Sequence, residues 1–149
     1  DAVEARNRRD AASEPTPHAP VVAQAERAAA AVIRTLRDVA TRLAGEAIEG
    51  CALVAVRPKA TNLGSRDAAE YLVDIYPDAP FAPGGNFNWS TYNAVVRPSE
   101  ELVVASDALE LVLRRMQPVE EHARALGMQT EWVEGYFGLP RERTLIARW

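Results

Sequence analysis

The side chains best suited to covalent chemistry are the single cysteine, Cys51, and His122. Nucleophilic catalysis would also need a carboxylate, such as Asp74 or Asp107, to orient the imidazole. Cys51 opens an apolar stretch, where cysteine usually serves as a small core side chain, and no neighbouring cation would activate its thiol. We therefore expect a structural cysteine and assign no catalytic residue.

Metal and phosphate sites also lack their usual sequence patterns. One helical turn before His122 stand Pro118 and Val119, which cannot ligate a metal, and the other histidine is His18 in the N-terminal arm. The glycine pair at 84–85 is not followed by Lys-Ser or Lys-Thr, so it does not indicate a phosphate-binding loop. We expect neither a metal nor a cofactor.

Scattered polar residues could still assemble into an active site in the fold, because such sites leave no motif in the sequence. A small enzyme is therefore kept as an alternative. The residues to test for it are Asp74, Asn86, Asn88, Tyr92 and His122.

Two loops combine aromatic and polar residues in the way that recognition surfaces do. Aromatic rings offer a large contact area, while asparagine and serine offer adaptable hydrogen bonds. The first loop follows Gly84 and Gly85, and the second precedes Pro140. We expect partner-binding residues in both loops; they are Phe87, Asn88, Trp89, Tyr92, Tyr136 and Phe137. Folding back of the first loop to cap the core is the competing interpretation.

The charge balance argues against nucleic-acid binding. The net charge is −4, and a small arginine excess at Arg141, Arg143 and Arg148 is too weak to indicate an RNA site. The chain has no apolar run long enough to span a bilayer and no apolar signal region at its start, so we expect no membrane insertion. With one cysteine, an intracellular or organellar compartment is favoured.

Residues 1–20 mix charges of both signs with three prolines and have little to bury, which predicts a flexible arm. Residues 21–149 form the single domain. Apolar positions from about Ala23 to Ala47 follow the spacing of one helix face, which predicts a long amphipathic helix. Small side chains at 28–31 would let another element approach closely.

Strands are expected at 51–57, 71–76, 91–97 and 102–105, with Asp74 on the less buried face or satisfied by a partner. The prolines and glycines at 77–85 are expected to end the second strand. Asp107 and Glu110 have the spacing of a capping box for a second helix, which Pro118 should kink or restart and Gly127 should cap. Two further strands are expected at 130–134 and 144–149.

This order of elements predicts an α+β fold, because no regular β-α-β alternation appears. We expect a mostly antiparallel sheet of four to six strands, with the long N-terminal helix and a Pro-interrupted second helix packed on one face. The favoured function is a non-enzymatic protein-protein interaction module, a structural or accessory subunit that binds a protein partner or its own copies. An inhibitor or immunity-type protein that binds a basic partner is a further alternative.

Overall fold

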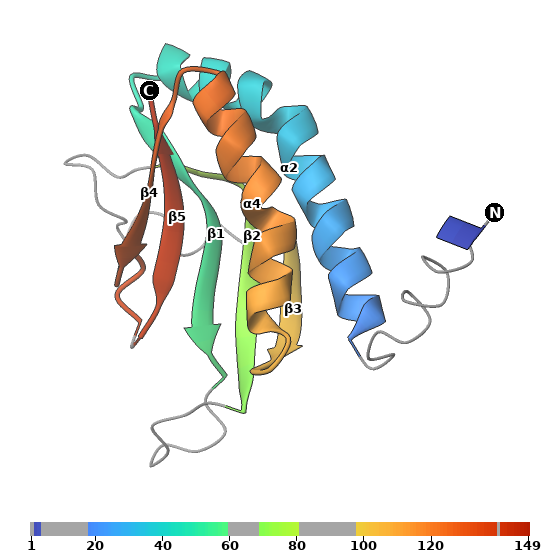
Figure 1. The fold of residues 1–149 in the computed structure, drawn as a ribbon. Coiled ribbons are helices and arrows are strands. Elements are labelled where there is room, and N and C mark those ends of the chain that lie inside the picture. Colours follow the sequence, from blue (N-terminus) through green and yellow to red (C-terminus); the bar gives the residue numbers. More distant parts are fainter. Residues whose placement is uncertain (1, 4–17, 60–68, 81–97, 140) are drawn as a thin grey trace.

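The computed structural model describes residues 2–3, 18–59, 69–80, 98–139 and 141–149. Their helices and strands, labelled as in Figure 1, are α2 (Ala19–Gly45), β1 (Gly50–Pro58), β2 (Glu70–Pro80), β3 (Glu100–Ala105), α4 (Leu109–Ala125), β4 (Gln129–Glu134) and β5 (Arg143–Arg148). The expected strand at 91–97 and most of the expected arm lie outside the described residues.

The five strands form one antiparallel sheet in the order β3-β2-β1-β5-β4. Both helices lie side by side on the same face of this sheet (Figure 1). The predicted α+β fold, with its antiparallel sheet and helices on one face, is therefore confirmed. The main core fills the space between the helices and the sheet.

Helix α2 buries one stripe of small and branched side chains: Ala25, Ala28, Ala29, Val32, Leu36, Ala40 and Leu43. The spacing of three and four residues keeps this stripe on a single face. Alanines in the first half leave room for α4, which packs against α2 along its length. The helix begins at Ala19, four residues before the predicted start, with Pro20 in its first turn, where the missing N–H breaks no helical hydrogen bond.

A bulge in β1 sets which side chains face the helices. Ala52 pairs with Ile146 of β5 and Val54 with Leu145, so Leu53 is an extra residue in β1. Consequently Leu53 and Val54 both belong to the core beneath the helices, whereas Ala52 and Ala55 face the other way. The small side chains of these two alanines leave space on the face of the sheet that is turned away from the helices, called here the open face.

Strand β2 continues to Pro80, so the prediction that the prolines would end it near Tyr76 was wrong. Val54 pairs with Ile75 and Ala52 with Ala79, which places residues 76–78 of β2 opposite the single residue Leu53. Pro77 therefore lies in the irregular part of the pairing, where a missing N–H removes no regular ladder hydrogen bond.

Helix α4 continues through Pro118, so the predicted restart is wrong, whereas a kink at Pro118 stays a prediction. The predicted capping box is also not formed, because the N-cap is Ala108 and no side chain caps the helix. Asp107 Oδ2 instead lies 3.3 Å from Nε2 of His18, the residue before α2. Gly127 follows the helix with a φ of 87°, and its N–H donates to the Arg124 carbonyl, which confirms it as part of the C-terminal cap.

The segment between β4 and β5 folds back over the open face. Tyr136 and Phe137 pack there in a second core cluster with Tyr76 of β2, whose ring stacks on that of Phe137 at a centroid distance of 5.0 Å. Glu142 is 1% exposed and holds this segment in place. Its Oε1 accepts a hydrogen bond from the Phe137 N–H at 2.6 Å, and its Oε2 accepts one from Thr144 Oγ1 at 2.6 Å.

Within the described ranges, no helix has both the length and the apolar character needed to cross a membrane.

Candidate functional site

The path of α4 across the sheet creates a groove. The helix starts just after β3, at one edge of the sheet, and ends just before β4, at the other edge, and it contacts both strands. It therefore crosses the strands obliquely and leaves part of β4 and β5 uncovered on the helix-facing side (Figure 1). The resulting groove, called here the α4–β4 groove, has a volume of about 620 Å³.

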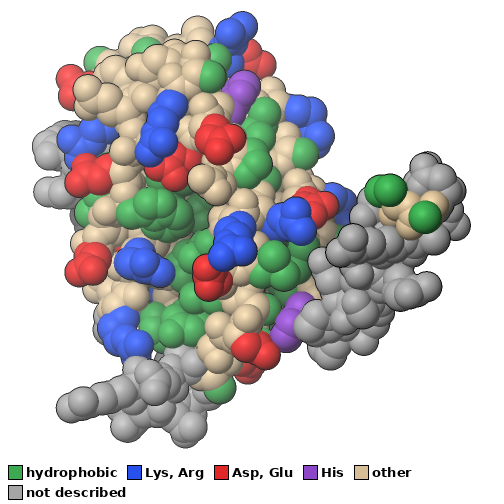
Figure 2. Space-filling view, viewed as in Figure 1, with side chains coloured by type: hydrophobic (Ala, Val, Ile, Leu, Met, Phe, Trp, Pro, Cys, Tyr) green, Lys and Arg blue, Asp and Glu red, His purple; other side chains and the backbone are tan. Residues whose placement is uncertain are grey.

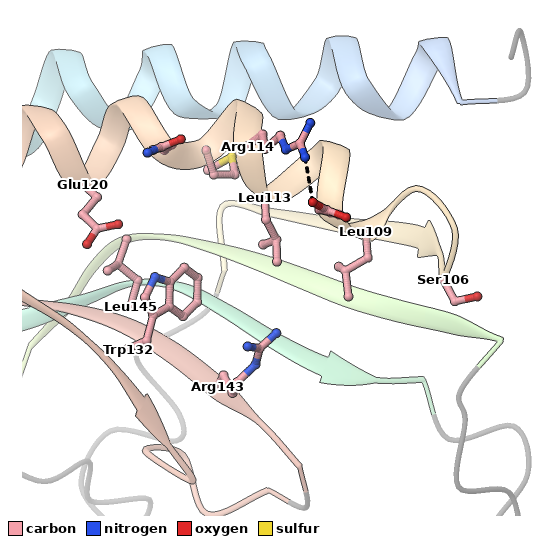
Figure 3. A pocket seen from close by; sticks show the side chains of 11 residues that line it. Ser106, Leu109, Leu113, Arg114, Glu120, Trp132, Arg143 and Leu145 are labelled. Carbon is pink, nitrogen blue, oxygen red and sulfur yellow. Dashed lines mark hydrogen bonds and ion pairs between the residues drawn. The ribbon is translucent and has the colours of Figure 1, made fainter. Parts of the chain in front are cut away.

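One wall of the groove comes from a second stripe of α4, beside the stripe that faces the core. Leu109, Leu113, Met116, Gln117 and Glu120 are spaced so that they share one helix face, and all five line the groove. Leu109 and Leu113 are half-buried and point toward the strands (Figure 3). Met116 is buried in the core, so the wall is apolar where it meets the floor.

The opposite wall and the floor come from Trp132 of β4 and from Arg143 and Leu145 of β5. Trp132 lies directly opposite Leu145, and Glu134 directly opposite Arg143. Leu145 is buried in the floor, whereas Trp132 is 38% exposed. Figure 3 shows the Trp132 indole and the Arg143 guanidinium both pointing toward α4. Trp132 is therefore a large apolar side chain of this hairpin that is only partly buried.

Most of the charged side chains that line the groove have a partner. Arg114 forms an ion pair with Glu110 at 2.7 Å, drawn in Figure 3, and Glu120 forms one with Arg124. Glu120 also lies within hydrogen-bond distance of Thr130 Oγ1, at 3.3 Å. Arg143 is exposed and forms no ion pair with any carboxylate of the described residues. Among the described residues that line it, the groove therefore combines an apolar floor with one cation, Arg143, that has no ion-pair partner.

The groove is visible on the surface. Figure 2 shows apolar side chains gathered between α4 and the β4–β5 edge, with acidic and basic side chains around them. A second hollow of about 570 Å³ adjoins it at the end of the sheet and shares Leu109 and Arg143 with it. Arg143 therefore stands where the two hollows meet.

The structure describes two of the six expected partner-binding residues. Tyr136 and Phe137 are only 9% and 2% exposed, because their rings pack against the open face. Phe87, Asn88, Trp89 and Tyr92 lie outside the described residues. Partner binding at these six positions stays a prediction.

The residues kept for the enzyme alternative are not brought together where they can be placed. Asp74 lies on the open face of the sheet, 3% exposed, whereas His122 belongs to α4 on the opposite face. Asn86, Asn88 and Tyr92 lie outside the described residues. Cys51 is buried in the main core. In the described part of the chain, no group of three or more His, Cys, Asp or Glu residues could hold a metal ion.

Asp74 occupies a strained electrostatic position on the open face. It lies directly opposite Glu101 of β3, and Arg57 of β1 contacts both carboxylates, Asp74 at 3.2 Å and Glu101 at 3.5 Å. Burial raises the pKa of Asp74 above its ordinary value, although the Arg57 guanidinium opposes this shift. Burial and then the Asp74 charge also raise the pKa of the Tyr76 phenol. These contacts explain how the charged side chains of Arg57, Asp74 and Glu101 are accommodated together on the sheet. Asp74 lines neither the α4–β4 groove nor the hollow beside it.

Sequence reasoning missed the α4–β4 groove because its walls come from three elements. The alternation in β4 did place Trp132 and Glu134 on one face, and the helical spacing of Leu109, Leu113 and Glu120 was readable. Nothing in the sequence, however, indicated that this face of α4 would lie opposite that face of β4.

Comparison of the chain with protein families, with curated proteins and with solved structures finds no match.

Proposed function

We propose that this protein is a non-catalytic binding module whose protein partner docks in the α4–β4 groove. The observation that carries the proposal is the exposed indole of Trp132 on the wall of an apolar groove. Tryptophan and arginine dominate the binding energy of protein interfaces, especially beside apolar pockets rimmed by charges. Trp132, Arg143 and the half-buried leucines of α4 supply that combination.

The chemistry of the groove supports binding rather than catalysis. The described residues that line it include neither a histidine nor a cysteine, and Glu110 and Glu120 are each engaged by an arginine. A general base would need an accessible carboxylate or imidazole directed at a substrate. A partner segment would need only the apolar floor and a rim that makes polar contacts.

Substitution of Trp132 tests the proposal. A partner protein should first be captured with the wild-type chain from an extract of the source cells and purified. The Kd of this partner should then be measured for wild type, Trp132→Ala and Trp149→Ala. Trp149 is a matched control, since it is also a partly exposed tryptophan, at 36%, but its indole N–H donates to the Ile48 carbonyl away from the groove. We expect Trp132→Ala to weaken binding by about 30-fold or more and Trp149→Ala to change it about twofold at most.

The partner could also be a second copy of the chain, so the mass in solution must be measured across a concentration series by light scattering. If wild type is a dimer and Trp132→Ala is a monomer, the groove binds a second copy of the chain. A partner or dimer that binds Trp132→Ala as tightly as wild type contradicts the proposal.

Small-molecule binding in the same groove is the second candidate function. Its volume of about 620 Å³ is that of a drug-sized ligand site, since such sites measure roughly 300–1,000 Å³. Saturable shifts of the Trp132 indole N–H resonance with decanoate, at concentrations below those at which decanoate forms micelles, would favour this candidate.

A further inference from the structure

The charges around the α4–β4 groove are unevenly compensated, and this asymmetry bears on what docks there. Arg114 and Glu120 are paired with Glu110 and Arg124, so these two groups are already neutralised. Arg143 has no ion pair with the described carboxylates. Glu134 lies opposite Arg143 in the β4–β5 pair, but the two side chains form no ion pair, and Glu134 does not line the groove.

We infer that the α4–β4 groove binds a peptide segment in which a large apolar side chain stands next to an aspartate or glutamate. The apolar side chain packs between Trp132 and Leu113, and the carboxylate pairs with the Arg143 guanidinium. This inference rests on the proposed function and names its partner chemistry. A planar guanidinium binds a carboxylate through two parallel hydrogen bonds, which also fixes the direction of the segment in the groove.

The dimensions of the groove suit an extended chain. Its helical wall runs from Leu109 to Glu120, a distance of about 16 Å at 1.5 Å per residue, which roughly five extended residues would span. Because Trp132 and Arg143 are exposed, a segment can insert side chains while its backbone stays at the surface. The sign of the Arg143 charge selects an acidic segment, the opposite of the basic partner that an inhibitor acting through its acidic surface would require.

Selection from a random peptide library on phage tests this inference and does not require the natural partner. The library, with peptides of roughly twelve residues, is panned against wild type, Arg143→Gln, Trp132→Ala and Arg34→Gln. Arg34 is an exposed arginine of α2, away from the groove, and serves as the matched control. We expect Asp or Glu next to a large apolar residue to be enriched with wild type and Arg34→Gln, and this acidic preference to be lost with Arg143→Gln.

The Kd values of one selected peptide and of its Asp→Asn version then measure how much the peptide carboxylate gains from Arg143. With wild type and Arg34→Gln, the Asn peptide should bind about three- to fivefold more weakly, as expected of a partly exposed ion pair. With Arg143→Gln the two peptides should bind equally. Glu134→Gln should tighten binding of the Asp peptide, because it removes a carboxylate that lies opposite Arg143 in the sheet and repels the peptide's own carboxylate. Added salt should weaken that binding.

The outcomes separate this inference from the proposed function. Selection of apolar peptides without an acidic preference, dependent on Trp132, overturns the inference and supports the groove as a docking site. Enrichment of Lys and Arg, an acidic preference that survives Arg143→Gln, or no selected peptide at all also overturns it. Peptides selected equally well by Trp132→Ala bind elsewhere and contradict both proposals.

Discussion

Asp74 Oδ2 accepts a hydrogen bond from Arg57 Nε at 3.2 Å, whereas Asp74 Oδ1 is buried without a hydrogen-bond partner among the described residues. The carboxylate is therefore only half satisfied. It also lies directly opposite Glu101, so a second negative charge adds to the cost of burying it. Arg57, which contacts both carboxylates, offsets part of this cost.

The unfolding free energy should depend on pH through Asp74. The pKa of Asp74 in the folded protein lies above its ordinary value of 3.8, so the folded state favours the protonated carboxyl. The contribution of this group to the unfolding free energy is therefore fully present below pH 3.8 and is lost as the pH rises through the folded pKa. Asp74→Asn cannot ionise and avoids this loss. Relative to wild type, we expect the unfolding free energy of Asp74→Asn to increase from about pH 4 to about pH 7 in urea titrations. The same substitution at the exposed Asp38 of α2 should not reproduce the trend, and a constant difference at Asp74 would contradict the prediction.

Removal of the Arg57 guanidinium should destabilise the fold. Arg57→Met keeps an apolar stem but leaves Asp74 without its donor, which we expect to lower the unfolding free energy by roughly 1–3 kcal/mol at neutral pH. The loss should shrink in acid, where Asp74 is protonated, and should be smaller in the double variant with Asp74→Asn. Arg34→Met is the control for loss of an exposed arginine. Equal losses at acid and neutral pH would show that the ion pair is not responsible.

Glu142 should be required for the segment that carries Tyr136 and Phe137. Glu142→Ala leaves the Phe137 N–H and the Thr144 hydroxyl without the acceptor they share in the structure. We expect a loss of roughly 2–4 kcal/mol in unfolding free energy and a weaker near-ultraviolet circular dichroism signal from the aromatic rings. Glu142→Gln, which keeps one acceptor oxygen, should lose about 1 kcal/mol. Glu134→Gln, on the same hairpin but exposed, is the control; an equal effect there would argue against a specific role for Glu142.

Replacement of Pro118 by alanine should stabilise the folded protein. It lies inside α4, is exposed, and lacks the N–H that would extend the hydrogen-bond ladder. Pro118→Ala restores that donor and removes the ring, so we expect the unfolding free energy to rise by roughly 1–3 kcal/mol and Tm to rise with it. Gln117→Ala, at the neighbouring exposed position, should change it by only a few tenths of a kcal/mol. A fall in Tm for Pro118→Ala would mean that the proline sets a bend on which the packing of α4 depends.

Local sequence patterns were sufficient for most of the elements. Helix α2 was predictable because its buried residues recur every three or four positions, and β1 because an apolar run between Gly50 and Pro58 suits a buried strand. The end of α4 near Gly127 was predictable because a positive φ favours glycine. The prediction about Pro77 failed because this proline lies in the irregular part of the strand pairing, where no regular ladder hydrogen bond is lost. The predicted restart at Pro118 failed although this proline does lack a helical N–H, because Met116 and Val119 on either side of it are buried in the core and favour continuation of the helix.

The sequence by itself therefore determined which residues form the helix and strand faces, since periodicity and turn chemistry are local properties of the chain. Only the tertiary structure decided which faces meet. The oblique path of α4 placed Leu113 across from Trp132 and left Arg143 without a described partner, and the sheet register placed Asp74 between Arg57 and Glu101. These contacts join positions far apart along the chain, and side-chain spacing carries no information about such distances.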